Sequence, residues 1–251
     1  MASIVGATST IAGLLYLVYA APAILSIQAR VVFCIVFFGY ISYSSLLHVI
    51  FYRNAPAPKR SVHHVTLVSF NLLLAATCAM VSTELHMRGH SQMTFDASPS
   101  IATIVRQIIV ACVFENTVEY YWHCLLHCRF LYTRVHKVHH HYKRPQPFDD
   151  MYMHPFEGAV YYLVLYGPPF VFSMHVSAFA IYMIIMGTFG VLDHSGLPFR
   201  IPLVYNSEDH AMHHAKVIVN LGFPFPYWDI LHGTFEGEFA GINFHRPTRK
   251  L

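Results

Sequence analysis

Charged residues are scarce in this sequence of 251 residues: Asp, Glu, Lys and Arg together make up 12%, against roughly a quarter in ordinary soluble domains. The net charge is only +3, and no dense basic patch is present, which argues against nucleic acid as a partner. Internal repeats, low-complexity tracts, a Rossmann-type nucleotide motif and a haem-binding motif are missing as well. The composition is therefore neither that of a soluble domain nor that of a nucleic-acid-binding protein.

Cysteine is present in an odd number, five, and without a C-x2-C pair. Most of the cysteines lie in apolar runs, which favours reduced, buried thiols. Cys124 and Cys128 each follow a clustered histidine, which makes them alternative metal ligands. On a helix, however, they would lie about 100° around the axis from those histidines.

Hydrophobic residues are abundant, at 55% of the sequence, and they form long runs. Four runs approach or exceed the ~20 residues that a membrane-spanning helix needs. Pro22 and Arg30 interrupt the first pair, and because Arg30 is the first charge, we expect no cleaved signal peptide. The four runs cover residues 4–29, 31–52, 62–87 and 99–122.

A fifth apolar region, residues 158–192, is broken by Gly167-Pro168-Pro169. Proline pairs end helices, so we expect two shorter segments that form a hairpin. If the chain starts in the cytoplasm, crosses four times and returns through this hairpin, 13 of the 16 Lys and Arg residues lie on the cytoplasmic side. The positive-inside rule favours this topology, with Arg30, Arg88 and Arg106 as its exceptions.

Histidines gather in three short clusters, all on the predicted cytoplasmic side. A spacing of three or four residues places two imidazoles on one face of a helical turn, and imidazole suits zinc, copper, iron and nickel. Eight such ligands exceed what one tetrahedral ion needs, so the number predicts two metal ions. The clusters are His123-x3-His127, His136-x2-His139-His140 and His210-x2-His213-His214.

Three residues between the clusters are further candidates. His194 leaves the hairpin on the same side as the clusters, where it either completes a coordination shell or caps the hairpin. Asp193, which precedes it, and His154, in the motif His154-Pro155-Phe156-Glu157, are candidates for supporting the ligands.

Two carboxylates lie beside the clusters. Glu119 shares a helix face with His123 and His127, so it is a metal ligand, an acceptor that fixes an imidazole tautomer, or part of a plain helix–helix hydrogen bond. Asp209 directly precedes His210 and either holds an imidazole through its second ring nitrogen or caps a helix.

The three clusters, His154-Pro155-Phe156-Glu157, Asp193-His194-Ser195-Gly196 and Trp228-Asp229-Ile230-Leu231-His232-Gly233-Thr234 together resemble the fatty acid hydroxylase/sterol desaturase superfamily. The resemblance covers roughly residues 99–236. It implies a non-haem centre of two iron ions, with zinc as a replacement on isolation, that uses O2 to oxidise a membrane lipid. It also implies a separate electron donor such as cytochrome b5 or a ferredoxin-like carrier, and residence in the endoplasmic reticulum of a eukaryote.

We therefore expect an all-α membrane bundle with about four spanning helices, an apolar hairpin and a cytoplasmic histidine-rich helical cap. The expected regions are an N-terminal transmembrane region (1–98), a catalytic domain (99–236) and a C-terminal tail (237–251). The expected function is a sterol or fatty-acyl hydroxylase or desaturase. The alternatives are a histidine-rich metal-binding or metal-transport protein and an inactive, lipid-binding member of the family. The expected metal ligands are His123, His127, His136, His139, His140, His194, His210, His213 and His214.

Overall fold

The protein is described by a computed structural model that covers residues 24–52, 60–95, 99–197, 199, 201, 203–239 and 242–244. Helices dominate it. The larger helices are α2 (Ile27–Tyr52), α3 (Val62–Met87), α4 (Ile101–Leu126), α6 (Pro155–Leu165), α8 (Val176–Asp193) and α9 (Ser207–Lys216). The short helices are α5 (Arg129–Arg134), η1 (His136–His141), η2 (Asp149–Met151), α7 (Pro168–Val171) and α10 (Tyr227–His232). Two strand pairs complete it: β1 (Met93–Thr94) with β2 (Met174–His175), and β3 (Gly237–Phe239) with β4 (Ile242–Phe244).

Four of the described helices, α2, α3, α4 and α8, are long and apolar enough to cross a membrane. Large apolar side chains stay exposed along them, for example Ile101 at 81% and Ile184 at 67%. Such surfaces are costly in water and suit a lipid bilayer as solvent. The predicted all-α membrane bundle is confirmed.

The predicted helix boundaries agree with the structure in most places. α3 coincides with the predicted run 62–87, and the hairpin break at Gly167-Pro168-Pro169 separates α6 from α7 and α8. The break predicted at Arg30 is wrong, because α2 begins at Ile27 and the Arg30 amide bonds the Ser26 carbonyl. One charged residue near a helix end costs little, since its long side chain can reach the interface. Residues 4–23 of the first predicted run lie outside the described residues.

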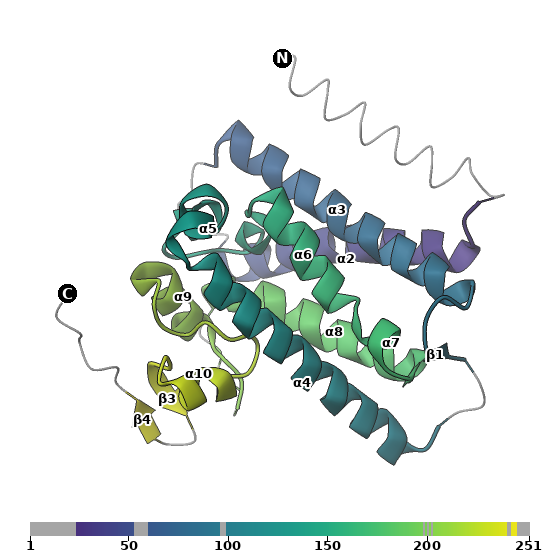
Figure 1. Ribbon diagram of the computed structural model, residues 1–251. Coiled ribbons are helices and arrows are strands. Elements are labelled where there is room, and N and C mark those ends of the chain that lie inside the picture. Colours follow the sequence, from purple (N-terminus) through teal and green to yellow (C-terminus); the bar gives the residue numbers. More distant parts are fainter. Residues whose placement is uncertain are drawn as a thin grey trace.

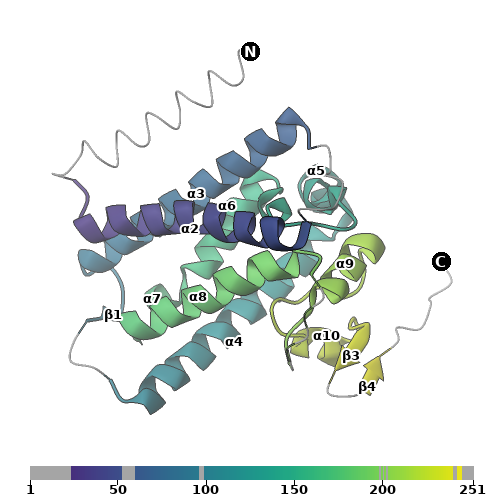
Figure 2. The ribbon, with the colours of Figure 1, turned by 180° about the vertical axis from the view of Figure 1, so that it is seen from behind.

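The long helices have their termini at two opposite ends, and one of these ends carries nearly all the irregular structure. Figures 1 and 2 show α5, α9, α10 and the β3–β4 pair together at one end of the bundle, with α7 and β1 at the other. We call the described residues of 127–154 and 194–239 the cap. All three histidine clusters lie in the cap or in the last helical turn of α4 beneath it.

Polar side chains of the long helices fasten the cap to the bundle. On α3, the Asn71 amide donates to the carbonyls of Met151 (2.9 Å) and Met153 (2.8 Å). On α4, the fully buried Asn116 donates to the carbonyls of Phe223 and Phe225. Because such bonds are directional and buried, they fix the loops before α6 and α10 against the membrane helices.

Candidate metal centre

The nine predicted histidine ligands lie in two groups, and each group has its ring nitrogens within 4.8 Å of one another. We call them the five-histidine group and the four-histidine group. The first consists of His123, His127, His136, His140 and His213, and the second of His139, His194, His210 and His214. The structure thus brings together side chains from stretches of the chain up to 90 residues apart.

In the five-histidine group, α4 ends so that His123 and His127 present their rings to η1. The Nε2 atoms of His123 and His136 are 2.9 Å apart, and those of His136 and His127 are 3.1 Å apart. The Nε2 atom of His140 follows at 3.0 Å from that of His136. The helix α9 adds His213, whose ring lies 4.6 Å from that of His123 between centroids.

In the four-histidine group, His194 lies at the end of α8 and is central. Its Nε2 atom is 3.2 Å from that of His139 and 2.9 Å from that of His210. His214, one turn after His210 on α9, has its Nε2 atom 2.9 Å from that of His210. His194 is also the C-terminal cap residue of α8, so the capping role is confirmed, and its place in the four-histidine group keeps it a candidate ligand as well.

The outward-facing ring nitrogens of three rings show which atom carries the proton. Each of these rings places Nδ1 next to a backbone carbonyl oxygen, which can only accept, so Nδ1 is the N–H donor and Nε2 keeps its lone pair. These contacts are His123 to Leu221 O (2.6 Å), His194 to Gly190 O (3.1 Å) and His213 to Val219 O (2.7 Å). Two further rings place Nδ1 beside a carboxyl group: His136 lies 2.8 Å from Glu157 Oε1, and His210 lies 3.0 Å from Asp193 Oδ2.

Several lone pairs that face one another at about 3 Å repel, unless a cation lies among them. The Nε2 atom of His213 supports this, since it is buried and has no hydrogen-bond partner among the described residues. A metal ion satisfies all of these donors at once. The donor sets therefore fit one metal ion in each group.

The electrostatics of the cap keep the imidazoles in the state that binds metal. Burial lowers the pKa of His194 and His210 to about 3, and it lowers that of His140 to about 3 and of His127 to about 2, in both cases with help from neighbouring histidines. The rings are therefore neutral at pH 7, and metal ions do not need to displace protons from them.

Two buried carboxylates orient rings, one in each group. Glu157, in the first turn of α6, faces Nδ1 of His136, and Asp193 faces Nδ1 of His210. Burial raises the pKa of Glu157 to about 8, and a metal ion bound in the five-histidine group would act in the opposite direction. Sequence reasoning missed Glu157, although it stands in the quoted His154-Pro155-Phe156-Glu157 motif.

A second missed residue is Asp229, which is fully buried. Its carboxylate accepts from the amides of Leu221 (2.9 Å) and Gly222 (2.6 Å) and from the hydroxyls of Tyr205 and Thr234. A Cβ atom at Gly222 would come within 2.9 Å of this carboxylate, so the close approach requires glycine. Asp229 thereby shapes the 219–223 segment, whose carbonyls hold His123 and His213.

The other predicted supporting residues have different surroundings. Asp209 forms a capping box with Asn206 at the start of α9. Of its two predicted roles, holding an imidazole or capping a helix, the structure shows helix capping. His154 caps α6 by accepting from the Phe156 amide (3.1 Å) and belongs to neither group. Glu119 does not fix a tautomer of His123, because Leu221 O takes that Nδ1–H. Cys124 and Cys128 are free thiols, and neither group includes a cysteine among the described residues.

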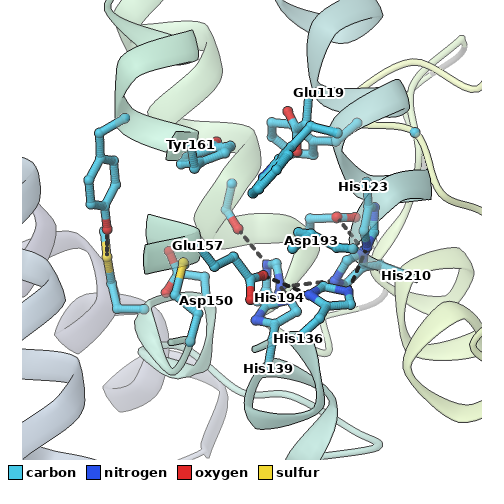
Figure 3. A pocket seen from close by; sticks show the side chains of 18 residues that line it. Glu119, His123, His136, His139, Asp150, Glu157, Tyr161, Asp193, His194 and His210 are labelled. Atoms are coloured by element: carbon cyan, nitrogen blue, oxygen red, sulfur yellow. Dashed lines mark hydrogen bonds and ion pairs between the residues drawn. The ribbon is translucent and has the colours of Figure 1, made fainter. Parts of the chain in front are cut away.

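A cavity adjoins both groups on the side of the membrane helices. Five of the nine histidines line it, together with Leu126, Met151, Met153 and Phe223. Its polar lining is acidic: Glu119, Asp150, Glu157 and Asp193, without Lys or Arg. Figure 3 shows His136, His194 and His210 together on one side of this cavity, with Glu119 and Tyr161 on another.

These features define a class: a helical membrane protein with a histidine-rich cap that can hold two metal ions over an apolar cavity. The family model described as fatty acid hydroxylase matches residues 108–234. The chain belongs to the fatty acid hydroxylase family. No solved structure matches it.

Curated relatives give the same family context. Lathosterol oxidase of Rattus norvegicus is 28% identical over 66% of this chain and 59% of its own length. A methylsterol monooxygenase of Aspergillus fumigatus is 31% identical over 54% of this chain and 50% of its own length. Sphinganine C4-monooxygenase 2 of Arabidopsis thaliana is 32% identical over 54% of this chain and 56% of its own length. The chain thus spans between half and three fifths of the length of these relatives.

Proposed function

We propose that this protein is an O2-dependent oxidoreductase that hydroxylates or desaturates a membrane lipid with two iron ions held by its two histidine groups. The observation that carries the proposal is the convergence of nine histidine rings, seven of them on buried residues, into two sets beside one cavity. The printed names of the relatives, which act on sterols and on sphinganine, support a lipid substrate. The family supports iron over zinc.

Two irons bound there would supply the redox chemistry, since imidazoles and carboxylates alone cannot reduce O2. For hydroxylation, the balance is RH + O2 + 2e⁻ + 2H⁺ → ROH + H2O. For desaturation, the same O2 and electrons remove two hydrogens from adjacent carbons and give two waters. A separate donor, such as cytochrome b5 or a ferredoxin-like carrier, supplies the electrons. The exposed side chains of Lys137, Lys143 and Arg144 offer positive charge for its approach.

The residues of the chain bind the metal ions, orient the imidazole rings and enclose the substrate. The histidines are the metal ligands, and Glu157 and Asp193 fix the orientation of one ring in each group. The apolar lining of the cavity, including Met153 and Phe223, accommodates hydrocarbon and excludes bulk water from the reacting bond. Because the cavity lies where the cap meets the bundle, a lipid can reach it from the bilayer, in the endoplasmic reticulum if the source is eukaryotic.

The test combines lipid profiling with isotope labelling. Cells that lack the protein are restored with the wild-type chain or with H210A, and both are grown under ¹⁸O2. The proposal predicts an oxidised lipid that only wild-type restores, carrying ¹⁸O after hydroxylation or a new double bond after desaturation. Equal lipid profiles with both copies would contradict it.

A metal transporter is the rival function, and it requires ligands along a path through the bilayer. The described histidine groups instead lie together at one end of the bundle. Metal flux into liposomes that contain the protein, without lipid oxidation, would support the rival. Selective lipid binding without oxidation or flux would support an inactive family member.

A further inference from the structure

The helix α10 of the cap lies along the side of the membrane helix α4. At its first residue, the Tyr227 hydroxyl donates to Val113 O (3.3 Å). At its last residue, His232 Nε2 lies 3.1 Å from the Tyr121 hydroxyl. Val113 and Tyr121 are eight positions apart, so α10 follows α4 for about 12 Å. Figures 1 and 2 both show α10 beside α4, on the side of α4 that faces away from α2 and α3.

The length of α4 sets a lower limit on the depth of these contacts in the membrane. With 26 residues, α4 is about 39 Å long, whereas the hydrocarbon core of a bilayer is about 30 Å thick. If α4 crosses the core, at most about 9 Å of it extends beyond the core on the cap side. Thr117, to which the indole N–H of Trp228 donates (3.1 Å), lies about 14 Å from the cap-side end of α4. Thr117 is therefore about 5 Å or more inside the core, and a tilt of α4 only increases this depth.

The loop that leads into α10 has a backbone that suits surroundings without water. The four successive carbonyls of residues 223–226 all accept hydrogen bonds. The side-chain amide of Asn116 on α4 donates to two of them, and the backbone amides of Tyr205 and Ile230 donate to the other two, both at 2.9 Å. Two residues of the loop are prolines, which have no N–H that needs a partner. Non-helical backbone is tolerated at membrane depth where its polar groups are satisfied within the protein.

The side chains where α10 meets α4 are apolar and aromatic. Leu231 is 69% exposed and Tyr121 is 48% exposed, and the Trp228 ring stacks on His232 with the centroids 5.6 Å apart. Tryptophan and tyrosine are enriched at membrane interfaces, because each combines an apolar ring with one polar group. The next exposed acidic residue after α10 is Glu238 on β3. Since a charged side chain is costly in hydrocarbon, the contact with the core ends before β3.

We propose that α10 is inserted into the membrane interface, with the face that carries Leu231 in contact with lipid acyl chains just below the headgroups. This face continues the exposed apolar surface of α4. Because Asp229 on α10 shapes the 219–223 segment, whose carbonyls hold two of the histidines, the bilayer supports the cap directly beside the five-histidine group. The inference is independent of the reaction that the protein catalyses.

The test uses the fact that the chain has only two tryptophans. W122F leaves Trp228 as the single tryptophan of the full chain, which is placed in vesicles of phosphatidylcholine brominated at a shallow, a middle or a deep position of one acyl chain. Bromine quenches a tryptophan that it approaches within the bilayer, whereas iodide, added on both sides of the vesicles, quenches one that is exposed to water. Shallow bromines are expected to lower the fluorescence of Trp228 by about half or more, and deep bromines should lower it less. Iodide should quench Trp228 much less than it quenches N-acetyltryptophanamide in the same buffer.

W228F is the matched control, because it removes the tested indole and keeps Trp122. The difference in quenching between wild-type protein and W228F measures Trp228 without the W122F change, and shallow bromines should again have the larger effect. Iodide quenching as strong as that of N-acetyltryptophanamide, without any effect of bromine, would place α10 in water and overturn the proposal. Protection from both quenchers would also overturn it, because protein, such as a second copy of the chain, would then cover α10. Strongest quenching by the deepest bromines would contradict the interfacial depth.

Discussion

The five-histidine and four-histidine groups lie next to each other, but the chain builds them from different elements. The first takes His123 and His127 from the end of α4, a long helix anchored in the bundle. The second takes no ligand from α4 and relies on η1, α9 and His194 at the end of α8. Three members of the four-histidine group line the cavity, against two of the five-histidine group. With one histidine fewer and more contact with the cavity, the four-histidine group would, under the proposed function, leave more room for O2 and substrate.

The largest expected effect comes from removing one ligand in each group. H210A leaves three histidines in the four-histidine group, and we expect iron to fall from about two ions to about one per chain, with activity lost. H127A leaves four histidines in its group, so it should keep more iron than H210A and should retain measurable activity. Iron per chain, measured by mass spectrometry, checks both. H90A, at the exposed far end of the bundle, is the control, and equal losses in H210A and H127A would remove the proposed difference.

The carboxylates behind the rings should give a smaller, group-specific effect. E157Q should weaken the five-histidine group through His136, and D193N the four-histidine group through His210. Losses of such supporting residues typically cost about 10–100-fold in metal affinity or activity. Competition with a chelator measures the affinity of each position. E238Q, which changes an exposed carboxylate, should leave the metal affinity of both groups unchanged. If E157Q and D193N weakened metal binding at the same histidine group, the assignment of one carboxylate to each group would be contradicted.

Asp229 offers a way to disturb one group from a distance. D229N weakens the bonds that shape the 219–223 segment, whose carbonyls hold His123 and His213, and should cost about 2 kcal/mol of stability. The five-histidine group should lose affinity while the four-histidine group keeps its own. Thermal unfolding and chelator competition test this together. Y205F, which removes one of the hydroxyl donors to Asp229, should lower the stability and the metal affinity of the five-histidine group by less than D229N does.

Acid should weaken both groups alike. Burial lowers the pKa of His127 in one group and of His210 in the other, while unfolded histidine titrates near 6.5. The unfolded state therefore binds more protons below this pH, so stability is fully present above about 6.5 and declines as the pH falls towards 3. The slope is about 1.4 kcal/mol per pH unit for each histidine that titrates. Thermal unfolding between pH 7.5 and pH 5 measures it, and a flat profile would contradict neutral, buried rings.

Much of this architecture could be predicted from the sequence, because apolar runs and histidine spacing leave strong local patterns. α3 and the proline break after α6 coincide with their predicted positions. The nine predicted histidines are also the ones that the structure gathers, although their role as ligands stays a prediction. Arg30 was misjudged, because a single charge near a helix end does not stop a spanning helix.

The assignment of histidines to groups could not be predicted. The second cluster gives His136 and His140 to one group and His139 to the other, and α9 divides its histidines similarly. Spacing alone cannot resolve this, since neighbouring turns point to neighbouring sites. The carbonyls of Val219 and Leu221 have no side-chain pattern, and the role of Asp229 follows from a loop that only tertiary packing defines.

The most direct test is anomalous diffraction at the iron absorption edge from crystals of the iron-loaded protein. We predict two peaks per chain, one enclosed by the ring nitrogens of His123, His127, His136, His140 and His213, the other by those of His139, His194, His210 and His214. A single peak shared by both groups, or iron bound away from these rings, would contradict the account.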